Sequence, residues 1–328
     1  MNLLKKVVPI KFKLAINLIS NYIEDLRRYW KFSTVSGVSS VNNKECQLIL
    51  NYHSLEKGML FSPIKPRFGK EKVINLHYYL NDLEIKNNVK KSQIFVGYKV
   101  MVEYYELHQE KKIDISDYYT EIQYQNYKNL ANDVLTIYKS AKLDYTKENF
   151  YKNSKDFYDF SFSRKSVRSF TGKLISHEKI KQVINLANNA PSVCNRQASK
   201  VYLVENKELV KFCLELQGGL TGYTEKINQI LILTSNREYF YSIGERNQLY
   251  IDGGIYLMNL LYSLHYHQIA CCPANWGKSV DVDNKIREKI KIKEQEQIIC
   301  IVAIGDATDN FNVTLSYRRH ADEVLEII

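Results

Sequence analysis

Residues 229–235 read QILILTS, a short apolar stretch rich in isoleucine. A run of this kind is typical of a strand that is buried on both faces of a sheet. KVYLVE (200–205) and QIICIVAIG (297–305) have the same character, and IACC (269–272) is a briefer apolar run. We therefore predict four strands in the second half of the chain.

Helical segments separate these strands. A helix is predicted from Ser176 to about Asn189, with Ser176 as the cap of its first turn. A long helix is predicted from Gly244 to His267, and a short one near residues 284–290. The alternation predicts a mixed domain of helices and strands over residues 156–328, a size in the ordinary range for one domain.

The first 155 residues carry a different pattern. Apolar and aromatic residues recur at three- and four-residue spacing over residues 70–85, 89–110 and 114–142, which predicts helices. Pro63 and Pro66 mark a loop between helices. We therefore predict a mostly helical extension, residues 1–155, ahead of the mixed domain.

Residues 1–30 interleave Leu, Ile and Val with Lys and Arg. This pattern has two explanations. Either the helix docks its apolar face onto the rest of the protein, as amphipathic helices usually do, or it makes a weak contact with a membrane surface. Docking is the favoured explanation, and both stay open.

The composition limits the partners and the compartment. A formal net charge of +10 favours anionic partners, namely nucleic acid, membrane headgroups or a phosphate-bearing small molecule. The six cysteines form no CxxC pair and no signal-peptide pattern precedes them, so we expect a reduced, cytoplasmic protein. No apolar run reaches the roughly 20 residues that a membrane helix requires.

Several common cofactor sites are excluded by their spacing. His265 and His267 lie two residues apart, which points them away from each other on a helix. A metal site that joins them to Cys271 and Cys272 is therefore not expected. IDGGIY and QGGL lack the glycine spacing of a dinucleotide-binding loop or of a P-loop.

Residues 163–170 read SRKSVRSF and place Arg164, Lys165 and Arg168 beside Ser166. Arginine binds a phosphate through two parallel hydrogen bonds, and lysine binds it as a point charge. A serine hydroxyl and free backbone amides add donors for an anion. The alternative is a solvated basic face, which is the commoner meaning of three cations in five residues.

Three further segments carry candidate ligand-binding residues. APSVCNRQAS (190–199) offers amide side chains that suit the edge of a heterocycle, unless it is a plain connection between elements. CCPANWG (271–277) predicts a turn after a strand, with outward backbone amides or simply a core tryptophan. SYRRHADEVLEII (316–328) contains a basic pair that suits a phosphate. The candidate residues are Pro191, Ser192, Asn195, Gln197, Pro273, Ala274, Asn275, Arg318 and Arg319.

Taken in order, these segments resemble the FMN-dependent nitroreductase family. The family's Arg-x-Ser-x-Arg/Lys motif is matched by Arg164, Ser166 and Arg168, and its PSxxNxQ loop by residues 191–197. VAIGD, followed by RRHADEVLEII, is similar to the family's closing strand and basic tail. The helix in IDGGIYLMNLLYSLHYHQIACC is similar to its D-x-G-x-x-x-x-N-L-L pattern, through Asp252, Gly254, Asn259, Leu260 and Leu261.

The resemblance implies an α+β fold, with a nitroreductase-like mixed sheet flanked by helices, and an FMN cofactor. It also implies where the cofactor lies. The phosphate end is expected to meet Arg164, Ser166, Arg318 and Arg319. The polar edge of the flavin is expected to meet Lys165, Arg168, Asn195 and Gln197. The region near the flavin N5 is expected to meet the backbone of Pro273, Ala274 and Asn275.

The implied activity passes a hydride from NAD(P)H through FMN to a small-molecule acceptor that the sequence does not identify. The implied assembly is a homodimer with FMN at the subunit interface and no nucleic acid. Two alternatives stay open. One is a family member that destroys its flavin or oxidises a heterocycle, and the other is a non-catalytic basic protein that binds a membrane or nucleic acid.

The sequence departs from the family pattern in two ways. The family's loop often continues Gln-Pro-Trp, but Ala198 and Ser199 follow Gln197 here, which alters the expected packing on the substrate side. Some members have a lysine close to the position of Ala198, so either Arg168 or Arg196 takes its place or the flavin has a different potential. The N-terminal extension resembles that of nitroreductase-like proteins associated with bacterial surface-polysaccharide genes, which points to a role in surface-polysaccharide metabolism. Three residues of this extension have two explanations, namely His53, Glu56 and Lys57. They relay protons to a substrate near the flavin, or they are solvated residues on the surface of a helix.

Overall fold

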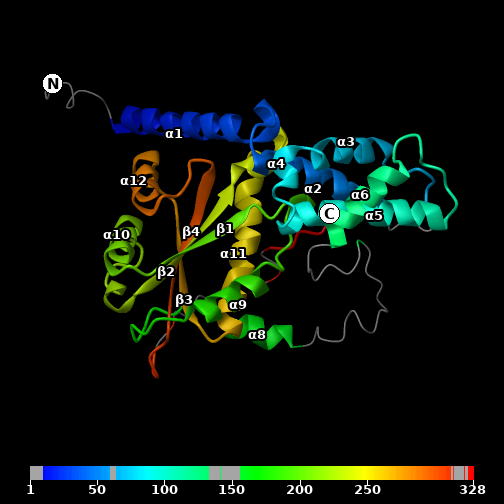
Figure 1. Cartoon of the computed structure of the whole chain (residues 1–328). Coiled ribbons are helices and arrows are strands. Elements are labelled where there is room, and N and C mark those ends of the chain that lie inside the picture. Colours follow the sequence, from blue (N-terminus) through cyan, green and yellow to red (C-terminus); the bar gives the residue numbers. More distant parts are fainter. Residues whose placement is uncertain are drawn as a thin grey trace.

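The computed structural model describes residues 10–59, 64–132, 141, 156–311, 313, 321 and 324–328 (Figure 1). Within these ranges the fold is of the α+β class, as predicted, with a helical N-terminal region and a sheet flanked by helices. None of the helices described is long and apolar enough to cross a membrane. The predicted boundary near residue 155 lies at the end of a segment outside the described residues, so it stays a prediction.

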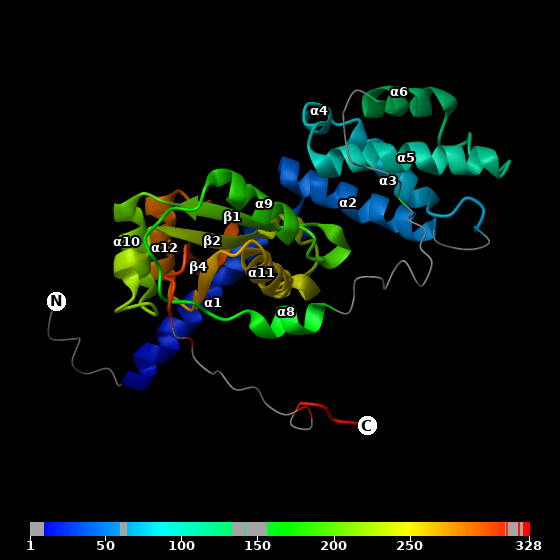
Figure 2. The same cartoon turned by 90° about the horizontal axis from the view of Figure 1, so that it is seen from below.

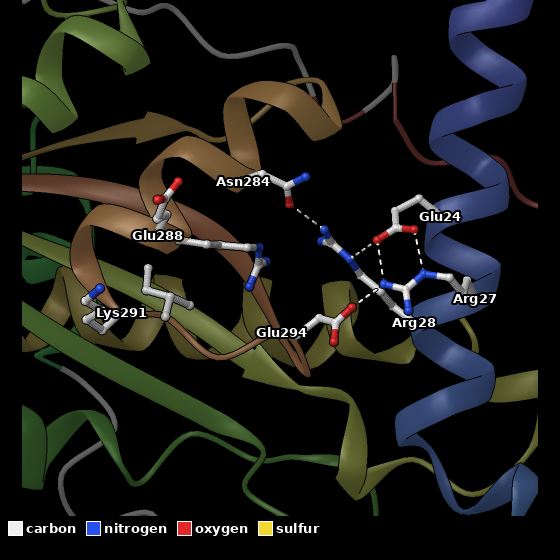
Figure 3. Close-up of a pocket in the computed structure, with 9 residues that line it drawn as sticks. Glu24, Arg27, Arg28, Asn284, Glu288, Lys291 and Glu294 are labelled. Carbon is white, nitrogen blue, oxygen red and sulfur yellow. Dashed lines mark hydrogen bonds and ion pairs between the residues drawn. The ribbon is translucent and has the colours of Figure 1, made fainter.

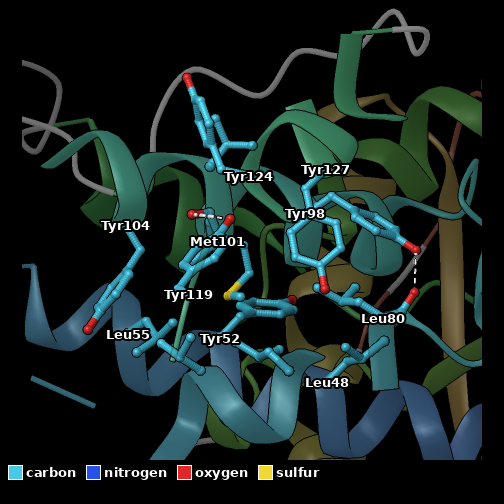
Figure 4. Close-up of a cluster of buried hydrophobic side chains, with 14 of the residues drawn as sticks. Leu48, Tyr52, Leu55, Leu80, Tyr98, Met101, Tyr104, Tyr119, Tyr124 and Tyr127 are labelled. Atoms are coloured by element: carbon cyan, nitrogen blue, oxygen red, sulfur yellow. Dashed lines mark hydrogen bonds between the residues drawn. The ribbon is translucent and has the colours of Figure 1, made fainter. Parts of the chain in front are cut away.

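Five helices of the N-terminal region form a bundle beside the sheet (Figures 1 and 2). The middle of the bundle is rich in tyrosine (Figure 4). Tyr98, Tyr104 and Tyr119 are fully buried, and each donates its hydroxyl to a backbone carbonyl, at 2.8, 2.7 and 3.2 Å. Buried tyrosines need such partners, and packing in this bundle explains part of the chain's 25 tyrosines. The helices are α2 (Val41–Gly58), α3 (Lys70–Leu80), α4 (Leu83–Lys86), α5 (Ser92–Glu110) and α6 (Glu121–Asn132).

Four strands form one antiparallel sheet in the order β1-β2-β4-β3. Because side chains alternate along a strand, Ile301 and Ala303 join the core on one face of the sheet, while Val302 and Ile304 join the core on the other. Burial of both faces explains why the strands are apolar without a break. The strands are β1 (Ser199–Val204), β2 (Gln229–Asn236), β3 (Ala270–Asn275) and β4 (Glu296–Gly305).

Helices cover the two faces of the sheet (Figures 1 and 2). On one face lie α9 (His177–Ala187) and the long α11 (Gln248–Tyr266), and on the other lie α10 (Lys207–Gln217) and α12 (Val280–Ile290). The short α8 (Phe157–Ser163) lies beside the end of α11, where Ser161 hydrogen-bonds Tyr262 at 2.7 Å.

The first helix, α1 (Ile10–Phe32), lies against the sheet domain near α12, and only its C-terminal end reaches the helical bundle (Figures 1 and 2). Its polar side makes the contacts. The backbone N–H of Val280 donates to the Asn21 side chain at 2.8 Å, and Arg28 pairs with Asp283 at 2.9 Å. The prediction that this helix buries its apolar face against the protein is therefore wrong, because that face is exposed.

Most predicted elements are present with shifted ends. Ser176 caps α9, and its hydroxyl accepts the backbone N–H of Lys179 at 3.3 Å. The helix predicted from residue 114 begins only at Glu121, and residues 133–140 lie outside the described part. The predicted turn at residues 273–275 is wrong, because these residues continue β3. Pro273 is tolerated there since β3 is an edge strand.

Candidate functional site

The SRKSVRSF segment leaves α8 in an extended conformation. Arg164 ends the helix with φ −66° and ψ 120°, and residues 164–169 form no regular element. The segment runs along the open edge of β3, where the N–H of Val167 donates to the carbonyl of Cys271 at 2.9 Å. The sheet therefore fixes the backbone of the basic motif.

Arg164 lines a cavity of about 250 Å³ between this segment, the end of α11 and β3. Its Nη1 atom is buried and has no hydrogen-bond partner among the described residues. A buried donor without a partner is unfavourable by about 1–3 kcal/mol, and more for a charged group. Lys165 lines the same cavity, and so do Phe311 and Val313. The cavity therefore offers a cationic end beside apolar walls, and an anion would satisfy Arg164.

Neighbouring side chains respond to the charge of Arg164. Burial lowers the pKa of His265, and Arg164 lowers it further. Burial raises the pKa of the Cys271 thiol to about 12, while Arg164 acts in the opposite direction. His265 lies in the cavity wall, and its Nε2 hydrogen-bonds the Ser163 hydroxyl at 2.7 Å. Burial therefore favours the neutral forms of the His265 imidazole and the Cys271 thiol beside Arg164.

The PSxxNxQ loop lies between α9 and β1 and holds unusual backbone conformations. Cys194, Asn195 and Gln197 have φ of 48°, 56° and 51°, a region that residues other than glycine rarely adopt. The N–H of Gln197 donates to the Ser192 hydroxyl at 3.0 Å, and its side chain donates to the Asn195 side chain at 3.1 Å. Clustered positive φ values are common at ligand-binding sites.

Two side chains of α11 hold this loop in place. The buried carboxylate of Asp252 accepts the N–H of Val193 at 3.2 Å, and the Asn259 amide donates to the carbonyl of Ala187 at 2.9 Å. A cavity of about 210 Å³ lies beside the loop. It is lined by Asn188, Ala190, Pro191, Ser192, Gln197, Ser199, Asp252 and Tyr256.

The two adjacent glycines of this helix differ in their packing. A Cβ at Gly254 would meet nothing within 4 Å, whereas a Cβ at Gly253 would lie 2.8 Å from the side chain of Ile299. Gly253 therefore allows α11 to approach β4 closely. The two neighbouring glycines differ only in which side of the helix they occupy, so their spacing could not distinguish them.

The remaining candidates lie in three places. Asn275 is exposed at the end of β3, and Gln217 donates to its carbonyl at 3.0 Å. Ser166 and Arg168 are half-buried beside β3, and Arg168 is close enough to Cys272 to oppose the rise that burial causes in the pKa of that thiol. Arg318 and Arg319 lie outside the described residues.

Arg196 is already engaged by other groups of the protein. It is 1% exposed, and its guanidinium pairs with Glu245 at 2.6 Å and donates to the carbonyl of Tyr239 at 2.7 Å. This pairing favours Arg168 over Arg196 as the residue in the place of the family's lysine, which stays a prediction. Glu245 is a structural residue that the sequence pattern missed, because the pairing joins segments about fifty residues apart.

His53 of the N-terminal extension lies on α2 and not in either cavity. His53 Nδ1 contacts the Glu56 carboxylate at 2.8 Å. Neither residue lines the cavity at Arg164 or the cavity at Ser192. The Lys57 side chain lies outside the described atoms. Among the residues that the structure describes, no group of His, Cys, Asp or Glu is suited to hold a metal ion.

The two cavities lie at opposite ends of α11. Asp252 lines one and His265 lines the other. At a rise of about 1.5 Å per residue, these positions on one helix are separated by about 20 Å. One chain therefore does not bring the basic motif and the PSxxNxQ loop together around one small ligand.

Comparison with known proteins agrees with the motifs. Residues 162–232 match the model of the nitroreductase family, and this match supports an oxidoreductase. No curated protein matches the chain. Solved structures with a similar fold include a nitroreductase-like protein from Streptococcus mutans, with 22% identity and a TM-score of 0.45 over 53% of this chain and 98% of that one.

Two further solved structures with a similar fold are associated with FMN. An FMN-dependent nitroreductase from Clostridium difficile has 17% identity and a TM-score of 0.40, over 48% of this chain and 91% of that chain. A chain from Desulfovibrio desulfuricans, solved in complex with FMN, has 18% identity and a TM-score of 0.42, over 51% and 93%. The family match itself covers the segment from α8 into β2, and over residues 162–232 it confirms the resemblance of this chain to the nitroreductase family.

Proposed function

We propose that this protein is an FMN-dependent oxidoreductase that takes a hydride from NAD(P)H and delivers it to a small-molecule acceptor. The observation that carries the proposal is the buried Nη1 of Arg164, which has no hydrogen-bond partner among the described residues and lies in a cavity of about 250 Å³. Arg164 belongs to the segment that matches the nitroreductase family. When bound, FMN would supply the hydride chemistry, and the protein would supply binding and orientation.

The residues at the cavity fit one end of this cofactor. A phosphate carries two negative charges and several acceptor oxygens, which suit the guanidinium of Arg164 and the ammonium of Lys165. The hydroxyl of Ser166, in the same segment, is proposed as a further donor. The neutral His265 in the wall leaves the cationic groups to bind the anion. The apolar side chains of Phe311 and Val313 suit the uncharged part of the ligand.

The other half of the site is proposed to come from a second copy of the chain. Asn195 and Gln197 lie near the opposite end of α11 from Arg164. A homodimer would bring these residues of one subunit to the same flavin as Arg164 of the other. An apolar surface on α11 supports this assembly. Ile251, Ile255 and Met258 recur at four- and three-residue spacing and are 54%, 39% and 38% exposed. A contiguous apolar face of this kind is typical of a subunit interface.

Titration of the purified protein with FMN tests the proposal. We expect FMN to bind to the wild type and to support NAD(P)H oxidation with a quinone or nitroaromatic acceptor. Arg164→Ala should weaken FMN binding roughly 10- to 100-fold, because a hydrogen bond to a charged group contributes about 1.5–3 kcal/mol.

Arg246→Ala is the matched control, because Arg246 is exposed and lines neither cavity. Its FMN affinity should equal that of the wild type. If the wild type shows no FMN titration signal, or if Arg164→Ala binds FMN as tightly as the control does, the proposed function is wrong.

A further inference from the structure

The outward side of α1 carries a continuous apolar stripe. Its spacing of four, three, four, three and four residues places all members on one side of the helix. Each member is between 52% and 66% exposed. From the first to the last, the stripe is about 27 Å long at a rise of about 1.5 Å per residue. We call these residues the outer stripe: Phe12, Ile16, Ile19, Ile23, Leu26 and Trp30.

The opposite side of α1 is fixed to the protein (Figure 3). Arg28 is 3% exposed and forms hydrogen bonds with Glu24, Asp283 and Asn284. Tyr29 is also buried, and its hydroxyl donates to the carbonyl of Ser242 at 2.6 Å. Rolling the helix to hide the outer stripe would break these bonds and leave buried charges without partners. The folded protein therefore presents the stripe outward.

Basic residues outnumber acidic ones on α1 and in the segment that packs against its polar side. Helix α1 has five Lys and Arg against two Asp and Glu, and residues 280–294, which pack against it, have five against four, a joint net charge of +4. The acidic side chains nearest the contact are engaged by arginines, as Asp283 is by Arg28 and Glu294 is by Arg27. Lys285, Lys289 and Lys291 are exposed on or just after α12. This surface suits an anionic partner.

The flanks of the outer stripe argue against a second copy of α1 as that partner. Paired helices of a coiled coil place opposite charges beside the apolar seam. Here one flank carries Lys13, Ser20 and Arg27, and the other carries Ala15 and Tyr22, so neither flank has an acidic residue. Two copies would face each other with basic and uncharged edges. Trp30 and Tyr22 instead are residue types enriched at the membrane–water interface.

We propose that α1 binds the surface of an anionic lipid bilayer, with the outer stripe at the boundary between headgroups and acyl chains. The helix would lie in the plane of the membrane, held to the protein by its polar side. An apolar face with basic flanks and aromatic residues has the composition of an interfacial helix. The net positive charge of α1 and of the segment that packs against it would add attraction to anionic headgroups. This inference stands independently of the FMN site.

Flotation of the full-length protein with vesicles tests the proposal. We expect binding to vesicles of equal parts phosphatidylglycerol and phosphatidylcholine, and much weaker binding to phosphatidylcholine alone. The double variant Ile19→Glu, Ile23→Glu should bind the anionic vesicles at least ~10-fold more weakly, because it removes two apolar side chains that the bilayer would bury. Ile122→Glu on α6 is the matched control, because Ile122 is 75% exposed and lies outside α1.

Tryptophan fluorescence provides a second readout. The chain has two tryptophans, and Trp276 is buried with its indole N–H donated to Asp283 at 2.9 Å. Anionic vesicles should therefore shift the emission of Trp30 alone to shorter wavelength, and Trp30→Phe should abolish the shift. The proposal is overturned if the wild type does not float, or if the double variant floats like Ile122→Glu. It is also overturned if the outer stripe controls only the oligomeric state in solution.

Discussion

Arg164 and Arg196 illustrate two opposite roles for one residue type. Both side chains enter the protein, but only Arg196 finds a complete set of partners, through Glu245 and backbone carbonyls. Arg164 keeps a buried Nη1 without a partner among the described residues and lines a cavity. A charged donor left open at a cavity indicates a binding role, whereas a satisfied buried ion pair indicates a structural one.

Removal of the Arg196 side chain should therefore affect stability. Arg196→Met leaves Glu245, whose side chain is 14% exposed, without its cation, so the free energy of unfolding should fall by roughly 3–5 kcal/mol. Urea unfolding of the variant measures this loss. The double variant Arg196→Met, Glu245→Gln should recover part of the stability, because it removes the unpaired charge. If Arg196→Met keeps wild-type stability and instead loses FMN affinity, the structural role is wrong.

At the scale of single elements, the sequence predicted what depends on local pattern. The strands were predictable because a short apolar run between turns is typical of a buried strand and too short for most helices. The cap of α9 was predictable because Ser176 and the first turn are adjacent in sequence. The side of α1 that meets the protein was not predictable, because it depends on Asp283 and Asn284, more than 250 residues away.

The helical bundle should lose stability in mild acid. Burial lowers the pKa of His77 to about 4 from an ordinary 6.5, and its Nε2 has no partner among the described residues. Between these values the unfolded chain binds a proton that the folded chain does not. The stability is therefore complete above pH 6.5 and falls as the pH drops toward 4, by up to roughly 3 kcal/mol. Burial also lowers the pKa of His108, which adds to the slope.

Urea unfolding between pH 4 and pH 7 measures this dependence. His77→Gln should flatten the slope, since glutamine does not titrate and can keep the hydrogen bond to the Tyr127 hydroxyl that the imidazole makes at 2.8 Å. Tyr78→Gln on α3 is the control and should leave the slope unchanged, because Tyr78 is 76% exposed and His77 stays in place. Parallel loss of stability in wild type and His77→Gln would show that another group is responsible.

At the scale of the whole molecule, the motifs and the geometry give different information. The order of the motifs along the chain and the types of their residues together predicted one flavin site. The folded chain separates the basic motif from the PSxxNxQ loop by about 20 Å, because the two segments lie near opposite ends of α11. Sequence spacing could not reveal this separation, since it depends on how α9 and β3 pack along α11.

Mixing two inactive variants distinguishes a site shared between subunits from a site within one chain. Arg164→Ala and Asn195→Ala should each weaken FMN binding. If each site takes Arg164 from one subunit and Asn195 from the other, a mixed dimer holds one site with both wild-type residues and one with neither. Random exchange makes half of the dimers mixed, so about a quarter of all sites should regain wild-type FMN affinity.

Recovery is measured by FMN titration after the variants are mixed under conditions that allow subunit exchange. Arg164→Ala mixed with itself is the control. A site built within one chain gives no recovery in either mixture, and that result would contradict the shared site while leaving FMN binding itself in place.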